Sequence, residues 1–415
     1  MKLIPILLLS IILAKSNLTF GQNNTEIEAQ MDQDYFTYNN DDRNYTMGFY
    51  LSVSSYVFDS CWHFRKAQNA LTYIEKRVNK NYSSPSFGNN TISFYFGGFT
   101  PDSIGTQSII YGDRPFSNVA CITHGVKFSI QKETDKVLKG TNIKKMRFKM
   151  NSFNFAFGMI GSPWAQKLQG RIHSTNNPYY KDTVANITPL YPYGWKNQIS
   201  NGGGITGLLQ FGSNFLITTH YLSRLHEGNT NKNGWTNHVN KKMNFFQEHV
   251  ELKVGYQLMT GYYNNVQLNS DIRIGIINPF NWTNNWTTNS SANNFINGPS
   301  KLGKAKKFEL FLFGNVKGNL MFYNSLLRGQ MFDFLTLGNT SNYTLSANEV
   351  EPFFLNATAG VALRIGGLFL SYAPISLRTY ELRTIDYYKR NHQWGELRLI
   401  LQFENKRKYY ENLLQ

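Results

Sequence analysis

The chain has 415 residues, of which 15% are aromatic and only 16% are charged. Its formal net charge is +16, because 42 lysines and arginines outweigh 26 acidic residues, and this surplus predicts an acidic partner. Nucleic acid does not fit as that partner, since the sequence contains no zinc-finger spacing, no basic helix and no aromatic block of an RNA-binding sheet.

The first 21 residues are typical of a secretory signal peptide. Lys2 supplies one positive charge, the apolar run 3–14 follows, and Gly21 is a small residue at the predicted cleavage point. The run is shorter than the roughly 18–20 residues that a bilayer-crossing helix needs. We therefore expect residues 1–21 to be removed and the mature, exported chain to start at Gln22.

The remaining sequence lacks an apolar stretch long enough for a transmembrane helix and instead repeats strand-like segments. These segments alternate apolar and polar residues over about 9–14 positions, as the strands of membrane barrels do. The aromatic and uncharged polar composition fits a barrel with a wet lumen, although a soluble β-sandwich could share it. We predict an all-β fold, a transmembrane antiparallel β-barrel of about 12 strands over residues 22–403, from the segments 26–31, 45–57, 91–99, 118–130, 145–157, 205–219, 248–259, 271–277, 308–320, 353–365, 368–375 and 397–403.

Several segments interrupt this pattern. Residues 64–78 have helical periodicity between the second and third strands, where a short periplasmic turn is normal, so a periplasmic plug, a contact helix and a simple insertion are all open. Segments 228–242 and 281–300 are polar, as cell-surface loops are, and 404–415 forms a charged tail. Two cysteines, Cys61 and Cys121, allow one bridge or two buried thiols but no metal site of the Cys/His type.

Residues 157–173 carry the most informative local pattern. An alternating strand ends at Gly158 and Gly161, after which Ser162 and Pro163 provide an N-cap and a first helical residue. On the short helix that follows, Gln169 and His173 share one face, where an imidazole base and an amide can act on one substrate or water. On spacing alone, a solvated surface histidine is the alternative.

These residues resemble the signature of the outer-membrane lipid A 3'-O-deacylase family, which has a glycine and proline turn, a helix with Gln-x-x-x-His and then Gly-Trp-x-x-Gln. The last element is present as Gly194-Trp195-Lys196-Asn197-Gln198. Two further blocks of the family occur upstream in the expected order: Asp34-Tyr35-Phe36 with Asp42-Arg43-Asn44-Tyr45-Thr46-Met47-Gly48, and Phe99-Thr100-Pro101-Asp102 with Asp113-Arg114-Pro115-Phe116. The matching blocks lie between residues 34 and 198, and the second half of the chain carries no motif.

The resemblance implies hydrolysis of an acyl ester of lipid A in the outer membrane, with lipopolysaccharide as the acidic partner. His173 would be the general base on water, Gln169 and Thr46 would complete the catalytic site, and Gln33 would line it. Asp34 would offer an oxygen ligand to Ca²⁺, which polarises the ester carbonyl. The sequence contains no Gly-x-Ser-x-Gly elbow of soluble serine hydrolases, and we expect a monomer.

The sequence departs from the family in two positions. Gln33 stands where the family has asparagine, and segment 101–113 contains no lysine, although the family places a catalytic lysine there. The competing hypothesis is therefore a non-catalytic barrel, either a porin-like channel or a surface-binding protein, that keeps these blocks as structural turns. Calcium-dependent release of fatty acid from lipid A separates the two hypotheses.

Overall fold

The computed structural model describes residues 25–37, 47–55, 58, 61–78, 86–87, 90–103, 106–137, 143–172, 192–217, 220–223, 249–277, 308–332, 335, 337–338 and 341–403. The predicted signal peptide, the predicted mature N-terminus at Gln22, the charged tail and the polar segments 228–242 and 281–300 lie outside these residues.

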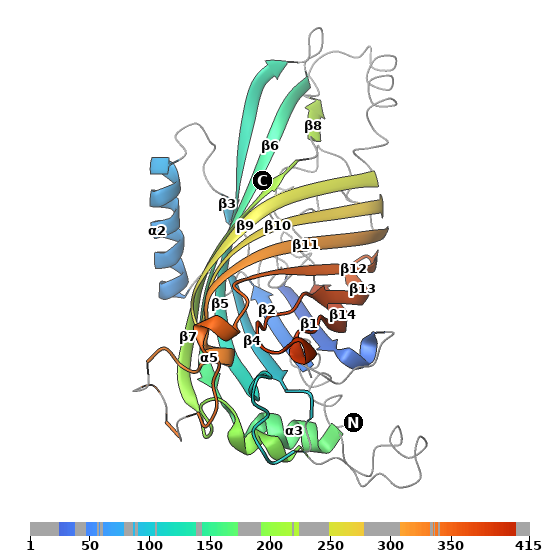
Figure 1. The fold of residues 1–415 in the computed structure, drawn as a ribbon. Helices are drawn as coiled ribbons and strands as arrows, with labels where there is room; N and C mark the ends of the chain where they lie inside the picture. The colour runs from blue at the N-terminus through green and yellow to red at the C-terminus, as the bar shows by residue number, and fades with distance from the viewer. Residues whose placement is uncertain are drawn as a thin grey trace, which may run out of the picture.

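The strands form one antiparallel sheet that closes on itself (Figure 1). Its order is β3-β5-β4-β2-β1-β14-β13-β12-β11-β10-β9-β7-β6-β8, and the additional pairing of β5 with β6 completes the ring. Without the short β3 (Ser86–Phe87) and β8 (His220–Ser223), which extend the edges of β5 and β6, the ring has 14 − 2 = 12 strands. The predicted twelve-stranded barrel is thus confirmed.

Each predicted strand segment falls on one strand of this ring. The observed bounds are β1 (Thr25–Gln33), β2 (Met47–Ser55), β4 (Asn90–Phe99), β5 (Ser117–Val137), β6 (Ile143–Ile160), β7 (Gly204–Leu216), β9 (Val250–Gly261), β10 (Tyr263–Ile276), β11 (Phe308–Asn324), β12 (Phe353–Ile365), β13 (Leu368–Arg378) and β14 (His392–Phe403). The connections contain α2 (Trp62–Val78), α3 (Trp164–Ile172), α5 (Ser325–Arg328) and the short 3-10 helices η1 (Asp34–Phe36), η4 (Tyr193–Asn197), η8 (Ala347–Glu349) and η9 (Asp386–Tyr388).

The outer wall is apolar because alternate residues of each strand face outwards. Along β11, exposed and buried positions alternate, and the exposed ones include Leu312, Val316 and Phe322. Comparable residues continue around the wall: Ile122, Phe155, Phe157, Leu209, Leu258, Leu268, Ile274, Phe353, Ile365, Leu370, Ile375 and Leu397. Such a belt is what a barrel presents to lipid. No helix among the described residues is long and apolar enough to cross a membrane.

The lumen of the barrel is crossed by a layer of buried charges. Glu251 accepts a hydrogen bond of 3.1 Å from Arg273 Nε, and its Oε1 also lies 3.1 Å from Lys253 Nζ. Beside them, Arg364 Nε lies 2.8 Å from Glu309 Oε2. All five side chains are at most 3% exposed. Buried ion pairs therefore occupy this part of the lumen.

Removal of Glu251 should destabilise the barrel strongly. Glu251→Ala deletes the carboxylate that Lys253 and Arg273 share in a buried environment, so we expect the free energy of unfolding to fall by about 3–5 kcal/mol. Glu351→Ala is the matched control, because Glu351 pairs with Arg383 at 2.8 Å on the exposed rim, where a loss of about 1 kcal/mol or less is expected. Urea titration of both variants in lipid vesicles measures the difference, and equal losses would contradict the interpretation of the layer.

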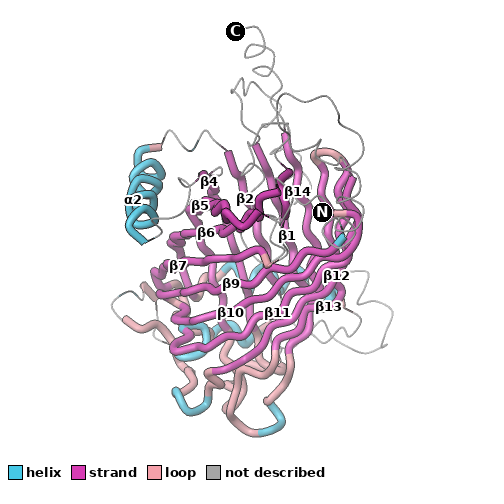
Figure 2. Tube along the Cα trace, turned by 90° about the horizontal axis from the view of Figure 1, so that it is seen from above, coloured by secondary structure: helices cyan, strands magenta, loops and turns pink. Residues whose placement is uncertain are grey.

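The two rims of the barrel carry different connections. One rim holds η1, α3, η4, α5, η8 and η9, and the other holds the outer ends of β1 and β14 at Thr25 and Phe403 together with α2 (Figure 1). The predicted helix at 64–78 is confirmed as α2, which stands against the outside of the wall near β5 (Figure 2). The strand directions place the β7–β9 and β10–β11 connections at the rim of α2. Both connections thus belong to the same rim as segment 64–78. The expectation that 64–78 is periplasmic and the expectation that 228–242 and 281–300 are cell-surface loops therefore cannot both be right.

Candidate active site

Helix α3 begins where the predicted turn ends β6. Gly161 has a φ of +77°, and a Cβ there would lie 2.0 Å from Ser200 O, so the turn requires glycine. Ser162 Oγ accepts a hydrogen bond of 3.3 Å from Trp164 N, which confirms Ser162 as the cap. The helix starts at Trp164, one residue after Pro163.

The helix packs against the outside of the barrel. Ala165 and Trp195 form a buried cluster with Met47, Phe96 and other residues of the neighbouring strands. Met47 and Phe96 face outwards, because their neighbours Tyr50 and Tyr95 line the lumen on the opposite strand parity. Helix α3 and η4 therefore lie against the lipid-facing side of β2, β4 and β5 at the rim.

Asn118 clamps this connection to the wall. Its Nδ2 donates to Ser162 O at 3.0 Å and to Gln198 Oε1 at 2.6 Å, and its Oδ1 accepts from Ser162 N at 3.1 Å. Gln198 Nε2 in turn donates to Asn201 Oδ1 at 3.1 Å. The glutamine of the Gly-Trp-x-x-Gln element thus serves to hold the loop, a role that the sequence did not reveal.

Gln169 lies on the wall side of α3. Its side chain is 1% exposed, and Oε1 accepts a hydrogen bond of 2.6 Å from Trp195 Nε1. Trp195 is equally buried and packs on Phe116 with ring centroids 5.1 Å apart. The two family elements that are separate in sequence, the helix glutamine and the tryptophan, therefore contact each other.

The segment with Asp34 lies on the same outer wall, over the neighbouring strands. Asp34 is the first residue of η1 and is 6% exposed. The carbonyl of Phe36 accepts a hydrogen bond of 2.8 Å from Tyr372 OH on β13. A Cβ at Gly395 on β14 would lie 2.5 Å from the backbone of Phe36, so the glycine makes room for η1.

Gln33 and Met47 connect these two structures. Gln33 is directly opposite Met47 on β2 and opposite Gly395 on β14, so all three share the outer face of the wall. Met47 packs with the α3 cluster, whereas Gly395 accommodates η1. The ends of β1 and β2 at Gln33 and Met47 are thus flanked by η1 on one side and by α3 with η4 on the other.

The predicted site residues are described only in part. Gln33 and Asp34 lie at the end of β1, Gln169 lies between α3 and the neighbouring wall, and Thr46 and His173 lie outside the described residues. Within the described ranges, no group of three or more His, Cys, Asp or Glu side chains is placed to hold a metal. The donor chemistry still fits calcium, since the buried Asp34 carboxylate is a hard oxygen ligand and Gln33 beside it has an amide oxygen.

The remaining family blocks close the mouth of the barrel. Asp102 accepts hydrogen bonds from Arg390 Nη1 at 2.7 Å and from Tyr387 OH at 3.2 Å. Asp113 accepts from Asp102 N and Arg114 N, both at 2.7 Å, and from Arg390 Nη2 at 3.3 Å. Burial raises the pKa of the Asp113 carboxyl, although these partners oppose the rise. The two aspartates therefore tie segment 100–116 to the β13–β14 connection.

Three further contacts strengthen this closure. Tyr343 OH donates to Asp113 O at 3.0 Å and accepts from Gly112 N at 2.8 Å, which brings in the β11–β12 connection. Arg114 lies 3.7 Å from Glu381. The aspartates of the Thr-Pro-Asp and Asp-Arg-Pro blocks are consequently explained by loop fixation, whereas Phe116, which ends the second block, packs on Trp195 at the outer-wall site.

The segment without the family lysine receives a cation from η4. Lys196 Nζ donates to Gln107 Oε1 at 3.3 Å, and Asn197 Nδ2 donates to Gln107 O at 2.9 Å. Lys167 on α3 is exposed on the face turned away from the wall. The sequence offered no signal for the Lys196 contact, because its partner is 89 residues away.

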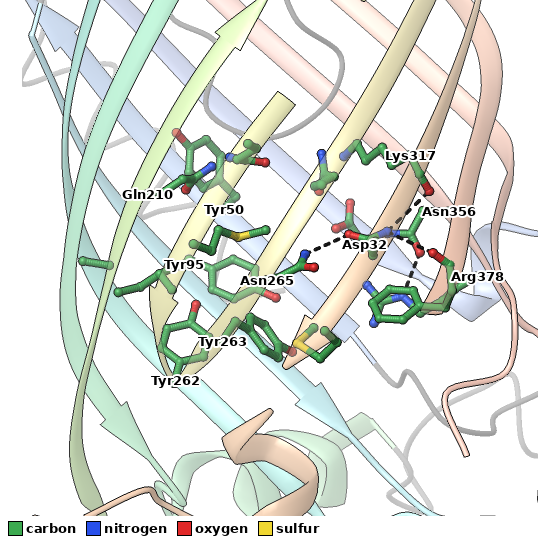
Figure 3. A pocket seen from close by; sticks show the side chains of 18 of the residues that line it. Asp32, Tyr50, Tyr95, Gln210, Tyr262, Tyr263, Asn265, Lys317, Asn356 and Arg378 are labelled. Carbon is green, nitrogen blue, oxygen red and sulfur yellow. Dashed lines mark hydrogen bonds between the residues drawn. The ribbon is translucent and has the colours of Figure 1, made fainter. Parts of the chain in front are cut away.

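A cavity of about 260 Å³ lies in the lumen between the closed mouth and the layer of charges. Figure 3 shows Tyr50, Tyr95 and Tyr263 on one wall and Lys317 and Arg378 on the other. The cavity is lined by inward-facing residues, and Gln33, Asp34 and Gln169 do not belong to its lining. The lumen cavity and the outer-wall site are therefore separate. Cys121 also faces this cavity, and both Cys61 and Cys121 are free thiols.

Fold and site together define a membrane-spanning β-barrel whose candidate active site faces lipid. The family model described as outer membrane protein LpxR matches residues 3–403, so the chain belongs to this family and resides in the outer membrane. The resemblance to the lipid A 3'-O-deacylases is thereby confirmed.

Comparison with solved structures supports the fold. LpxR from Salmonella typhimurium aligns with a TM-score of 0.53 and 13% sequence identity, covering 91% of this chain and 99% of that chain. The translocator domain of autotransporter NalP from Neisseria meningitidis aligns with a TM-score of only 0.30 and 7% identity, covering 95% of this chain and 93% of that one. A comparison with curated proteins found no match.

Proposed function

We propose that the protein is an outer-membrane lipid A deacylase, which hydrolyses an acyl ester of lipid A taken directly from the surrounding leaflet. The observation that carries this proposal is the position of the candidate residues on the lipid-facing wall. Gln33 faces outwards and Gln169 is buried between α3 and the wall. An acyl chain in the leaflet reaches such a site laterally, whereas a soluble substrate or a permeating solute would use the lumen.

The height of the site on the wall supports this access. Phe157 on β6 is 57% exposed and belongs to the apolar belt, and α3 begins one short turn beyond the end of that strand. On the outer face of α3, Trp164 is 63% exposed beside the exposed cations Lys167 and Arg171. Aromatic and basic side chains at this height are typical of the headgroup level.

The chemistry follows from the residues at the site. His173 as general base takes a proton from water, whose oxygen forms a bond with the ester carbonyl carbon. The bond between the carbonyl carbon and the sugar oxygen then breaks, and the proton passes from His173 to the leaving sugar oxygen, which becomes a hydroxyl. Asp34 would hold Ca²⁺, which would supply polarisation of the ester carbonyl, while Thr46 would complete the catalytic site and Gln33 would line it. A monomer suffices, since the proposed residues all come from one chain.

The channel hypothesis has less support. Solutes would have to pass a mouth tied shut by Asp102, Asp113 and Arg390 and then the buried layer around Glu251 and Arg273. These contacts favour a filled barrel as the scaffold for a site on its outside.

Mass spectrometry of lipid A tests the proposed function. Purified protein in detergent micelles with lipid A and Ca²⁺ should release fatty acid and leave a glycolipid lighter by one acyl chain. Excess chelator should stop the release while the barrel stays folded. Intact lipid A after prolonged incubation with folded protein would favour the non-catalytic barrel.

The exposed cations of α3 should contribute to recognition of the phosphorylated headgroup. We expect Lys167→Gln combined with Arg171→Gln to lower kcat/KM for bisphosphorylated lipid A about 30-fold, since each of the two cations near an anionic lipid surface contributes about 1 kcal/mol. The same double variant should hydrolyse dephosphorylated lipid A at nearly the wild-type rate. Lys66→Gln with Arg77→Gln on α2 is the matched control, because both cations lie near exposed aromatic rings at the opposite rim. An equal loss on both lipids would contradict phosphate recognition.

A further inference from the structure

Trp195 and Gln169 form a buried hydrogen-bonded pair between η4 and α3. The hydrogen bond between Trp195 Nε1 and Gln169 Oε1 is 2.6 Å long, and both side chains are 1% exposed. Trp195 itself is held by packing on Phe116 and by the buried cluster that it forms with Met47, Phe96 and Ala165. The indole of Trp195 is thus held in one position, from which it can orient the amide of Gln169.

The chemistry of the indole decides the orientation of this amide. The Trp Nε1 group is a donor only, whereas a glutamine amide has an acceptor side and a donor side. If the Gln169 amide were turned by 180°, its Nε2 donor would face the Trp195 Nε1 donor, and no hydrogen bond could form between them. Trp195 therefore holds the Gln169 oxygen and leaves its Nε2 directed elsewhere.

The Nε2 group of Gln169 is a buried donor without a partner among the described residues. Buried donors in proteins are almost always paired, because an unpaired one carries a desolvation cost. Gln169 lies one turn after Ala165, which packs with Met47, and Met47 is directly opposite Gln33. The donor is therefore available between helix and wall at the candidate active site.

We propose that Trp195 is a positioning residue that turns Gln169 into a hydrogen-bond donor for the carbonyl oxygen of the scissile ester. The inference rests on the proposed function and deepens it. As water adds to the carbonyl carbon, the electron pair of the double bond moves to this oxygen, and a preorganised N–H stabilises the growing charge. The bond is stronger in the transition state than with bound ester, so its loss reduces kcat more than it raises KM.

Gln169→Glu tests the donor role. The variant keeps the side-chain length and an oxygen for Trp195, but it presents a second oxygen where Nε2 was. We expect kcat to fall about 10²–10³-fold with KM nearly unchanged. Protonation of the new carboxyl restores a donor, so activity relative to wild type should rise as the pH is lowered. Gln166→Glu is the matched control, because it adds the same charge to the same helix, where Gln166 only donates to Pro192 O at 3.4 Å.

Trp195→Phe tests the positioning role. It keeps an aromatic ring on Phe116 and removes the N–H, so the amide is no longer oriented, and we expect kcat to fall about 10-fold. In the Gln169→Ala background the same change should have no further effect, because the two residues act through one contact. Phe116→Leu is the control for packing, since Phe116 contacts the indole but is not bonded to Gln169.

The outcomes separate the inference from the function on which it rests. Heat-modifiable migration on gels shows that each variant is folded. A wild type that leaves lipid A intact overturns the proposed function and this inference with it. If the wild type is active, any one of three results overturns the inference alone. These results are full activity of Gln169→Glu, additive effects of Trp195→Phe and Gln169→Ala, and a loss in Phe116→Leu equal to that in Trp195→Phe.

Discussion

His173→Ala should lower turnover of lipid A by roughly 10²–10⁴-fold, the usual contribution of a positioned general base. The barrel should remain folded, because His173 follows α3 at Ile172 and α3 lies outside the hydrogen-bonded ring. Release of fatty acid from lipid A by purified wild type and variant, with equal amounts of heat-modifiable protein, gives the ratio. Wild-type turnover by the variant would exclude His173 as the base.

The pH dependence provides a second readout for the same residue. Only neutral imidazole accepts a proton, so kcat/KM should rise with pH through an apparent pKa near the ordinary histidine value of about 6.5. Below that value the imidazole is already protonated and the rate falls. His249→Ala is a control, since His249 bonds to Gly275 O at 2.9 Å near the opposite rim. Its profile should superimpose on that of the wild type.

The barrel could be predicted from sequence because each strand shows its own alternation. In β11, for example, Leu312 and Val316 face lipid while Asn315 and Asn319 face the lumen, and this pattern is local. The register and closure then follow from antiparallel neighbours, as in the pairing of Thr25 with Phe403 that joins the two ends. The alternation of apolar and polar residues with a period of two is therefore sufficient to predict most of the barrel.

The location of the site could not be obtained in the same way. Helix α3 lies outside the barrel because it packs on Met47 and Phe96, which face outwards. These two residues belong to β2 and β4, which are far from α3 in sequence, so the pattern around α3 does not contain this information. The closure of the mouth is equally non-local, because Asp102 and Arg390 are 288 residues apart. The sequence blocks therefore predicted that these aspartates matter but not that they fix loops.

The polar segments show how strand parity limits a local interpretation. Their composition suggested cell-surface loops at 228–242 and 281–300, yet β7 and β9 are joined at the rim of α2, opposite α3. Counting strands from α3 would have revealed this, since every second connection returns to the same rim. Polar composition indicates only that a loop is exposed to water. Both sides of an outer membrane face water, so composition does not show at which rim a loop lies.

Asp34→Asn should remove most of the activity and the response to calcium together. The substitution keeps the shape of the side chain but removes the charge that attracts a divalent cation, so we expect kcat to fall about 10²–10³-fold, as when one stabilising contact to an oxyanion is lost. Binding can be measured without turnover, because a ligand that binds only the folded state raises its unfolding temperature. Calcium should raise this temperature for the wild type and not for Asp34→Asn.

The control for this substitution lies at the same rim. Asp386 is also the first residue of a 3-10 helix, but it is 95% exposed and pairs with Lys389 at 2.8 Å. Asp386→Asn should therefore retain both activity and the calcium response. If calcium stabilises Asp34→Asn as much as the wild type, the ion binds elsewhere and Asp34 is not its ligand. If activity persists in excess chelator while His173→Ala is inactive, the histidine acts without a metal, and stabilisation of the oxyanion falls to Gln169, whose free Nε2 is the remaining buried donor among the described residues of the site.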